Sequence, residues 1–318
     1  MSFVLKLIAS VLLLAFVVYL IDFARVWATL NDLPWWYFVF AALFQTVLLL
    51  VVSLRWWIVS PGSSFARLTR VTFGSQHLMF LFPSSVTLDA VRLWSVRSDP
   101  SGIAGNIGAI LSDKIAGLAA MLICFGISGL IADLPSDLNL LLQQPALFSL
   151  AGGIIMVAVL MFDAGQQAYK CMSRSHLGRA IASKIPSRII DLSSKALLAG
   201  SGISRTRMLV NVCAAILYQL LVICGYWLMA LVFDFQMSIS QMLFISSFMQ
   251  IVMLFPVSVA GIGLKDVSLV YALGLFGVES SVAFSASISG YPISVAFAIF
   301  GWMLSSKNIN QRDNTLGL

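Results

Sequence analysis

Charge is the property that this chain has least of. Only 10% of its 318 residues are Asp, Glu, Lys or Arg, whereas 60% are hydrophobic and the mean hydropathy is +0.97. Soluble globular domains carry about 25% charged residues, so this composition excludes a soluble protein and predicts an integral membrane protein. No polar stretch is long enough to form a separate soluble domain. We therefore expect residues 1–318 to form a single membrane domain.

Residues and motifs that carry catalysis are scarce as well. The chain has two His and four Cys, with no Cys-x-x-Cys pair. It has no Walker or Rossmann glycine loop, no His-Glu-x-x-His and no nucleophile elbow. We therefore expect no enzyme activity, no catalytic residue, no metal site and no cofactor. The net charge of +6 comes from basic residues in loops between apolar segments, which indicates membrane orientation rather than nucleic-acid binding.

Six apolar runs are long enough to cross a bilayer, which takes about 20 helical residues. The runs lie at about 3–21, 34–54, 107–131, 146–163, 208–234 and 280–304. No small-x-small cleavage site follows the first run, so we expect it to be an uncleaved anchor rather than a signal peptide. The pattern predicts six full transmembrane helices.

The positions of the charges predict which loops face the cytoplasm, because cytoplasmic loops are rich in Lys and Arg. Segment 165–207 carries eight basic residues against one acid, Asp191, so it should be cytoplasmic, either as an amphipathic helix on the inner leaflet or as a solvated loop. The acidic loop 132–145 then lies outside, and the basic loops 55–70 and 92–106 lie inside. This order predicts a bacterial-type inner-membrane protein with both termini cytoplasmic.

One short sequence occurs twice. Leu-Phe-Pro-Ser-Ser-Val at 81–86 returns as Leu-Phe-Pro-Val-Ser-Val at 254–259. Proline removes a backbone donor and disfavours helix at the residue before it, so both copies should break a helix. Because both ends of 68–95 are expected in the cytoplasm, this segment cannot cross the membrane once and should turn back near Pro83.

The second copy lies in segment 238–276, which follows a span that exits outward, so it should enter from the outside and turn at Pro256. The two hairpins then belong to an inverted repeat, with a first half at about 34–163 and a second at about 208–304. The expected fold class is an all-α polytopic membrane protein with six full transmembrane helices and two oppositely oriented re-entrant helical hairpins.

The expected hairpin tips have the composition of an anion site. Ser84 and Ser85 are good N-cap residues for the returning arm of the first hairpin, and helix N-termini favour negative charge. In the second hairpin, Ser258 and the backbone at Gly261 and Gly263 are suited to the same role. Two such N-termini meeting in one cavity would suit a phosphate. The simpler alternative, that the serines only cap the helices, stays open.

Charged residues near the two tips complete the predicted substrate site. Arg92 and Lys265 supply positive charge, and the carboxylates of Asp89 and Asp266 can orient them. Asp113 and its neighbour Lys114 lie inside the 107–131 span, where charges are costly and indicate function. We expect Asp113 to face protein, with Arg92 as its partner. Asp89 shares a helix face with Arg92, so the two are expected to pair when no ligand is bound. The secondary candidates are Gln76, His77 and Lys114.

These residues also carry a resemblance to a known family. The Pro83…Asp89-Ala90-Val91-Arg92 stretch, the Asp113-Lys114 pair and the Pro256…Gly261-Ile262-Gly263-Leu264-Lys265-Asp266 stretch are similar to motifs of the flippase-like membrane domain of lysylphosphatidylglycerol synthases. The similarity covers most of the chain, with departures at Leu88, Lys114 and Ala260. The aminoacyl-transferase domain of bifunctional members is absent, so the resemblance implies lipid handling without lipid synthesis.

The leading hypothesis is a flippase-like transporter that moves an anionic phospholipid or a polyprenyl-phosphate-type lipid between leaflets. A secondary transporter for a small anionic solute would use the same hairpins around a closed aqueous cavity. A membrane-embedded transferase would need an acid/base or metal cluster. A non-transporting accessory subunit of a lipid or glycan assembly enzyme is a further alternative. Homo-oligomerisation and association with a biosynthetic enzyme both stay open, as does the identity of the lipid.

Overall fold

The computed structural model describes residues 22–60, 62–78, 85–97, 102–162, 202–255, 257–258 and 261–315. Throughout these ranges the regular secondary structure is helical and no strand occurs. The predicted first span at 3–21 and nearly all of the basic segment 165–207 lie outside the described residues. So do Pro83, Ser84 and Pro256, and Ser85 is described as the first residue of a helix but not in its side chain.

Five stretches of the described chain are long and apolar enough to cross a membrane. They are Trp35–Val59, Ile103–Ile131, Leu138–Met161, Arg205–Val232 and Ser280–Ser305. These stretches coincide with five of the six predicted spans and confirm a polytopic, all-helical membrane protein. The helices that contain the first four are α3 (Trp35–Val59), α7 (Gly102–Ile131), α8 (Ser136–Met161) and α12 (Arg205–Val232).

Two loop boundaries differ from the expected ones. Helix α3 continues past residue 54 to Val59, so Arg55 and Trp56 are buried helical residues rather than part of a loop. The sequence places Arg55 in a loop because its charge is costly in an apolar helix, but Asp113 supplies a counter-charge there. Helix α8 begins at Ser136, directly after its N-cap Pro135, so most of the expected outer loop 132–145 is helical.

The last predicted span consists of two helices rather than one. Helix α15 (Ser280–Ile288) ends before Ser289, and α16 (Tyr291–Thr315) starts after Gly290. Pro292, the second residue of α16, has no N–H to donate to residue 288 and thus favours a break at this position. Helix α15 packs against α14 (Leu264–Gly274) and α2 (Phe23–Asn31), whereas α16 packs against α4 (Phe65–Gly74).

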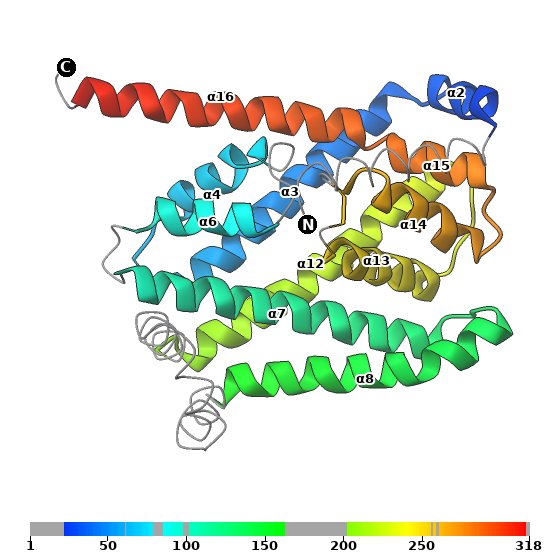
Figure 1. The fold of residues 1–318 in the computed structure, drawn as a ribbon, viewed down its shortest axis with the longest axis horizontal. Helices are drawn as coiled ribbons and strands as arrows, with labels where there is room; N and C mark the ends of the chain where they lie inside the picture. Colours follow the sequence, from blue (N-terminus) through cyan, green and yellow to red (C-terminus); the bar gives the residue numbers. More distant parts are fainter. Residues whose placement is uncertain are drawn as a thin grey trace.

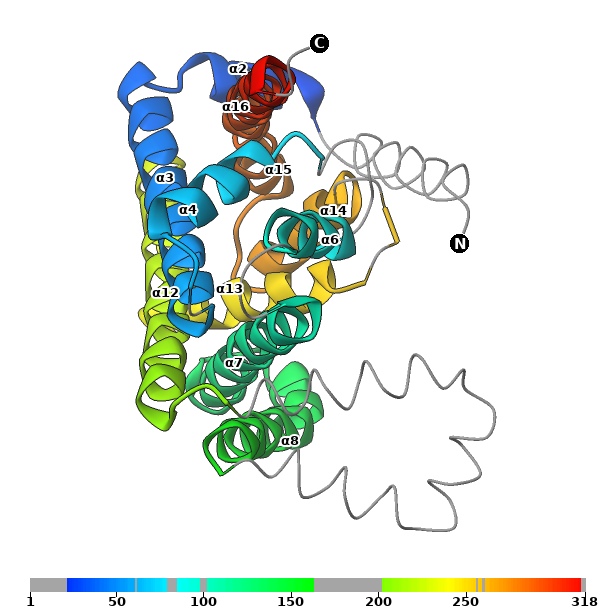
Figure 2. The same cartoon turned by 90° about the vertical axis from the view of Figure 1, so that its left-hand side faces the viewer.

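Two pairs of short helices occupy the regions of the two hexapeptides. Helix α4 packs against α6 (Ser85–Ser95), and α13 (Ile239–Met253) packs against α14. In Figure 1, α4 and α6 lie in the left half, near the start of α7, whereas α13 and α14 lie in the right half. Figure 2 views the molecule from the left-hand side of Figure 1. In this view α6 and α14 overlap at the centre, with α3 and α12 on one side and α7 below.

The directions of α6 and α14 bring their first turns toward the middle of the molecule. Just beyond the end of α6, the Val96 carbonyl accepts a hydrogen bond of 2.7 Å from Asn106 Nδ2 near the start of α7, at the left of Figure 1. The segment that follows α14 contains Glu279, which pairs with Arg25 of α2 at the right. The N-terminal ends of α6 and α14 therefore point inward from opposite halves.

Side-chain exposure agrees with lipid surroundings for the long helices. Large apolar side chains point outward on α8 and α12, for example Leu140, Phe148 and Trp227. Inside, Phe125, Phe244 and Phe248 stack between α7 and α13, with ring centroids 5.7 and 6.1 Å apart. Because lipid tails are as apolar as these side chains, close packing and polar contacts must hold the helices together.

Candidate functional site

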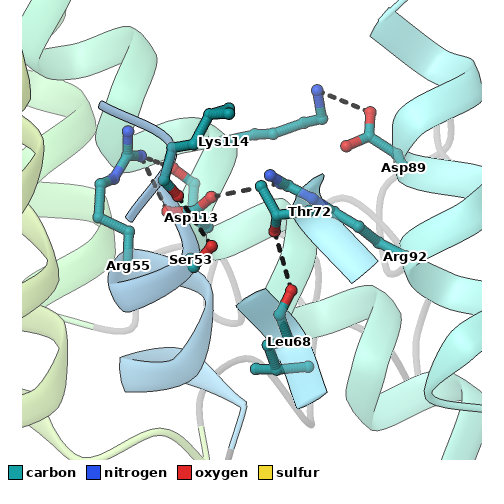
Figure 3. Close-up of polar contacts among 9 residues, drawn as sticks. Ser53, Arg55, Leu68, Thr72, Asp89, Arg92, Asp113 and Lys114 are labelled. Carbon is teal, nitrogen blue, oxygen red and sulfur yellow. Dashed lines mark hydrogen bonds and ion pairs between the residues drawn. The ribbon is translucent and has the colours of Figure 1, made fainter. Parts of the chain in front are cut away.

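A buried cluster of charges joins α3, α6 and α7 (Figure 3). Nη2 of Arg55 lies 2.9 Å from Oδ1 of Asp113 and donates a hydrogen bond of 2.7 Å to the Asp113 backbone carbonyl. Nη1 of Arg92, on α6, lies 4.0 Å from the other carboxylate oxygen, Oδ2. The side chains of all three residues are at most 12% exposed. The expected pairing of Asp113 with Arg92 is therefore present, and Arg55 joins it.

The cluster has more positive than negative charge. Among the residues that the structure describes, two guanidinium groups share one carboxylate, which leaves one positive charge without a carboxylate of its own. The guanidinium of Arg92 also lies over the ring of the fully buried Trp56, 5.2 Å from its centroid. A cation over an indole face is stabilised by roughly 0.5–2 kcal/mol, which falls short of replacing a carboxylate. The arrangement can therefore accept an anion beside Arg92.

Asp89 and Lys114 form a second ion pair next to the cluster. Nζ of Lys114 lies 2.7 Å from Oδ2 of Asp89, and the Lys114 side chain is 44% exposed. The sequence predicts that Asp89 pairs with Arg92 when no ligand is bound, but the ion pair that Asp89 forms is with Lys114 of α7. Successive helical residues point about 100° apart, so Asp113 can face Arg55 while Lys114 reaches toward α6.

A glycine on α7 makes room for Arg55. A Cβ atom at Gly117 would lie 2.8 Å from Nη2 of Arg55, closer than side-chain carbons come to other atoms. The guanidinium thus rests against bare backbone one turn after Asp113. On α3 itself, the Ser53 hydroxyl donates to the Leu49 carbonyl at 2.8 Å and so needs no partner in another helix.

The second group of predicted residues gathers around Asp266, which has no exposed surface. Its Oδ2 accepts hydrogen bonds from the Gly263 N–H at 2.9 Å and from the Tyr291 hydroxyl at 2.6 Å. Its Oδ1 accepts one from the Ser287 hydroxyl at 2.6 Å. The carboxylate therefore fastens the first turn of α14 to α15 and α16 at the helix break. Both of its oxygens accept hydrogen bonds within the protein, which indicates a positioning role.

Lys265 differs from Asp266 in having no carboxylate partner among the described residues. Its ammonium donates to the Ser287 carbonyl at 3.1 Å and lies 4.2 Å from the centroid of the Tyr291 ring. A carbonyl and an aromatic face hold the charge in place without neutralising it. Lys265 is thus the cation of the second half that a ligand anion could neutralise, as Arg92 is in the first.

The turn before α14 needs glycine. Gly261 has φ +78° and Gly263 has φ +82°, in the left-handed region that other residues rarely adopt. Nearby, the Ser258 side chain is buried, and its Oγ has no hydrogen-bond partner among the described residues. A buried hydroxyl without a described partner therefore lies six residues before the start of α14 in the sequence.

Gly261→Ala should lower the free energy of unfolding by about 1–3 kcal/mol, because alanine at this φ is strained. The new Cβ would also collide with the end of the Met253 side chain, which must move. Gly274→Ala is the matched control, since Gly274 is helical and a Cβ added there would have no atom within 4 Å. Denaturant titration in detergent measures both; equal stability of the two variants would contradict the strained turn.

The predicted site residues thus fall into two groups, one at each short-helix pair. Asp89, Arg92, Asp113 and Lys114 form the first group, and Lys265 and Asp266 with the glycine turn form the second. No hydrogen bond or ion pair joins the groups among the residues that the structure describes. Of the secondary candidates, Gln76 donates to the Thr72 carbonyl at 2.9 Å, and the buried Nδ1 of His77 has no partner among the described residues.

Three residues of the site are not apparent from the sequence. Arg55, Ser287 and Tyr291 contact the predicted residues directly. The run of apolar residues after Arg55, Trp56-Trp57-Ile58-Val59, could have shown that this arginine belongs to the span. Nothing comparable marks Ser287 or Tyr291. In the part of the chain that the structure describes, no three His, Cys, Asp or Glu residues gather as metal ligands would.

Comparisons with known proteins agree with the resemblance. The family model of the lysylphosphatidylglycerol synthase transmembrane region matches residues 3–300. Searches of curated proteins and of solved structures find no significant match. The matched range contains both hexapeptides, both groups of site residues and all five candidate spans except the last five residues of the fifth. The chain therefore belongs to the family of lysylphosphatidylglycerol synthase transmembrane regions.

Proposed function

We propose that this protein is a flippase-like lipid transporter of the inner membrane that moves an anionic phospholipid or polyprenyl-phosphate-type lipid between leaflets. It binds and moves the lipid without changing it chemically. Both termini face the cytoplasm, and the α4/α6 and α13/α14 pairs are re-entrant hairpins that enter from opposite faces. The family supports a lipid-related function, and the specific lipid and the transport step belong to this proposal.

One observation carries the proposal: within the described part of the chain, the buried cluster around Asp113 has two guanidinium groups for one carboxylate. Charges in low-dielectric surroundings are costly unless paired, so the cluster favours an anion next to Arg92. Arg92 lies in the last turn of α6, so its side chain rather than the N-terminus of the helix supplies the positive charge at this position. In the other half, Lys265 supplies a positive charge from the first turn of α14, where the helix dipole is positive as well.

The proposal gives the other charged groups supporting roles. Arg55 and Asp113 form a neutral pair that holds Arg92 in place, and the Lys114–Asp89 pair fixes α6 against α7. When a phosphate binds Arg92, Asp113 can stay with Arg55, since their atoms are 2.9 Å apart compared with 4.0 Å for Arg92. Arg92 is thus the guanidinium that is least tightly held and best able to follow a headgroup.

Arg92→Gln should slow lipid exchange in proteoliposomes by about ten- to a hundredfold, because a hydrogen bond to a charged group contributes about 1.5–3 kcal/mol. The variant should still fold, since the Arg55–Asp113 pair remains. Exchange is measured with fluorescent phosphatidylglycerol and a membrane-impermeant quencher. Lys265→Gln should reduce exchange as well, by removing the cation of the second half.

Arg97→Gln is the matched control for Arg92→Gln. Arg97 follows the end of α6, and its exposed side chain stacks on the ring of Trp94 at 3.8 Å, away from the cluster. Its loss should leave exchange unchanged. Unchanged exchange in the Arg92 and Lys265 variants would show that the cluster does not bind the lipid. Absence of exchange in the wild-type protein, combined with Arg92-dependent uptake of a soluble anion, would favour the solute transporter instead.

A further inference from the structure

A pocket separate from both charge clusters lies where the end of α3 meets the start of α12. Its volume is about 330 Å³. It is lined by Trp57, Ile58, Ser60, Gly62, Thr206, Arg207 and Val210. In Figure 1 this region is at the lower left, where α3 ends and α12 begins. By charge, this is the face of the membrane expected to be cytoplasmic.

The polar side of the pocket is built to receive an anion. Thr206 and Arg207 belong to the first turn of α12, whose N-cap Ser204 accepts a hydrogen bond of 3.4 Å from the Arg207 N–H. The earlier N–H groups of a first helical turn have no partner within the helix, and the dipole there is positive. The Arg207 side chain is exposed and adds a full positive charge.

A buried hydroxyl gives independent evidence of a missing ligand. Ser60 lines the pocket and is only 2% exposed, yet its Oγ has no hydrogen-bond partner among the described residues. Leaving a buried hydroxyl without a hydrogen-bond partner is unfavourable, because the group has lost its contacts with water. A helix N-terminus, an arginine and an unpaired serine hydroxyl on one pocket make a combination that suits the oxygens of a phosphate.

The remaining walls are apolar. Trp57 is 43% exposed and Val210 is 47% exposed, and the buried Ile58 completes the apolar lining. A free phosphate would leave these walls uncovered, whereas an acyl chain would cover them. Tryptophan beside a headgroup is also typical of the membrane interface. The pocket therefore has one end for a phosphate and one side for a hydrocarbon chain.

We propose that this pocket is a second lipid site, in which the phosphate of an anionic phospholipid binds the first turn of α12, Arg207 and Ser60 while its chain lies along Trp57 and Val210. The bound lipid bridges α3 and α12 at the membrane edge. This site does not depend on transport, because its residues are separate from Arg92 and Lys265. It holds a lipid from one leaflet whether or not the protein moves lipids.

Quenching of Trp57 fluorescence by lipids with brominated chains tests the site on the full chain in detergent micelles. The Trp57→Phe variant isolates the contribution of this residue. Brominated phosphatidylglycerol should quench Trp57 at about tenfold lower mole fraction than brominated phosphatidylcholine. Arg207→Gln should abolish this preference, and Ser60→Ala should weaken it a few-fold, since each removes a ligand of the phosphate.

Arg205→Gln is the matched control, because Arg205 has the same charge and lies in the same helical turn but does not line the pocket. It should keep the preference for phosphatidylglycerol. Equal loss in the Arg205 and Arg207 variants would mean that surface charge alone attracts the lipid and would overturn the site. Quenching without lipid preference in the wild type would also overturn it. Displacement of the lipid by millimolar inorganic phosphate would reassign the pocket to the free anion.

Discussion

Asp113→Asn should be the most destabilising change in the first half of the protein, lowering the free energy of unfolding by roughly 3–5 kcal/mol. Asparagine has nearly the same shape but no charge, so Arg55 and Arg92 would remain buried without a carboxylate. Removing one partner of a buried ion pair costs this much because the other charge cannot return to water. Denaturant titration in detergent micelles, followed by circular dichroism, measures the loss.

Asp89→Asn is the matched control for this prediction. Asp89 pairs with Lys114 at 2.7 Å, a shorter distance than that between Asp113 and Arg92, but the Lys114 side chain is 44% exposed. A partly exposed pair contributes only about 0–1 kcal/mol, so this variant should lose little stability. The difference in burial between the two ion pairs, rather than the difference in distance, is expected to set the difference in stability between the two variants. Equal losses would mean that water reaches Asp113 and that the cluster is not desolvated.

The second large effect is expected at Asp266, in the other half. Asp266→Ala removes the acceptor of three hydrogen bonds and leaves the Gly263 N–H and the hydroxyls of Ser287 and Tyr291 without it. Each unpaired buried donor costs about 1–3 kcal/mol, and such losses do not add fully. We expect a total of roughly 3–5 kcal/mol, measured by the same titration.

Tyr291→Phe separates one of these hydrogen bonds from the rest. The ring under Lys265 remains, and only the 2.6 Å bond from the hydroxyl to Asp266 is lost. The expected loss is about 1–2 kcal/mol, well below that of Asp266→Ala. Glu279→Gln is the surface control, because Glu279 pairs with Arg25 at 2.8 Å but both side chains are exposed, at 44% and 58%. A Tyr291→Phe loss as large as that of Asp266→Ala would show that the tyrosine alone fastens α14.

Much of the first cluster can be predicted because intramembrane charges are rare and therefore conspicuous. Asp113 stands in an apolar run, and Arg92 is the nearest cation of a broken helix, so their contact follows from the cost of burying either alone. The cost of burying a charge is also why the sequence does not predict the position of Arg55. Its charge favours a loop position in the sequence, and only the tertiary contact with Asp113 shows that a helix can contain it.

The second group shows a different limit. Lys265 and Asp266 follow the hexapeptide and a glycine turn, which marks them as site residues. Their partners Ser287 and Tyr291 are more than 20 residues further along, in what reads as one continuous span. The break at Ser289 and Gly290 brings both side chains onto Asp266. Pro292 favours a break at this position, but only the tertiary structure shows which side chains the break brings together.

Local properties of the chain are enough to establish a helical membrane protein, the places of five of its spans and a resemblance to its family. They suffice because the length of an apolar run, its charges and its prolines determine whether that single segment forms a membrane-spanning helix. Which charges meet is settled only when the helices pack. Packing places Arg55 beside Asp113 and pairs Asp89 with Lys114. It leaves the charges of Arg92 and Lys265 only partly neutralised by described residues. Ion pairing depends on distances between helices, and those distances are set by contacts that no single segment contains.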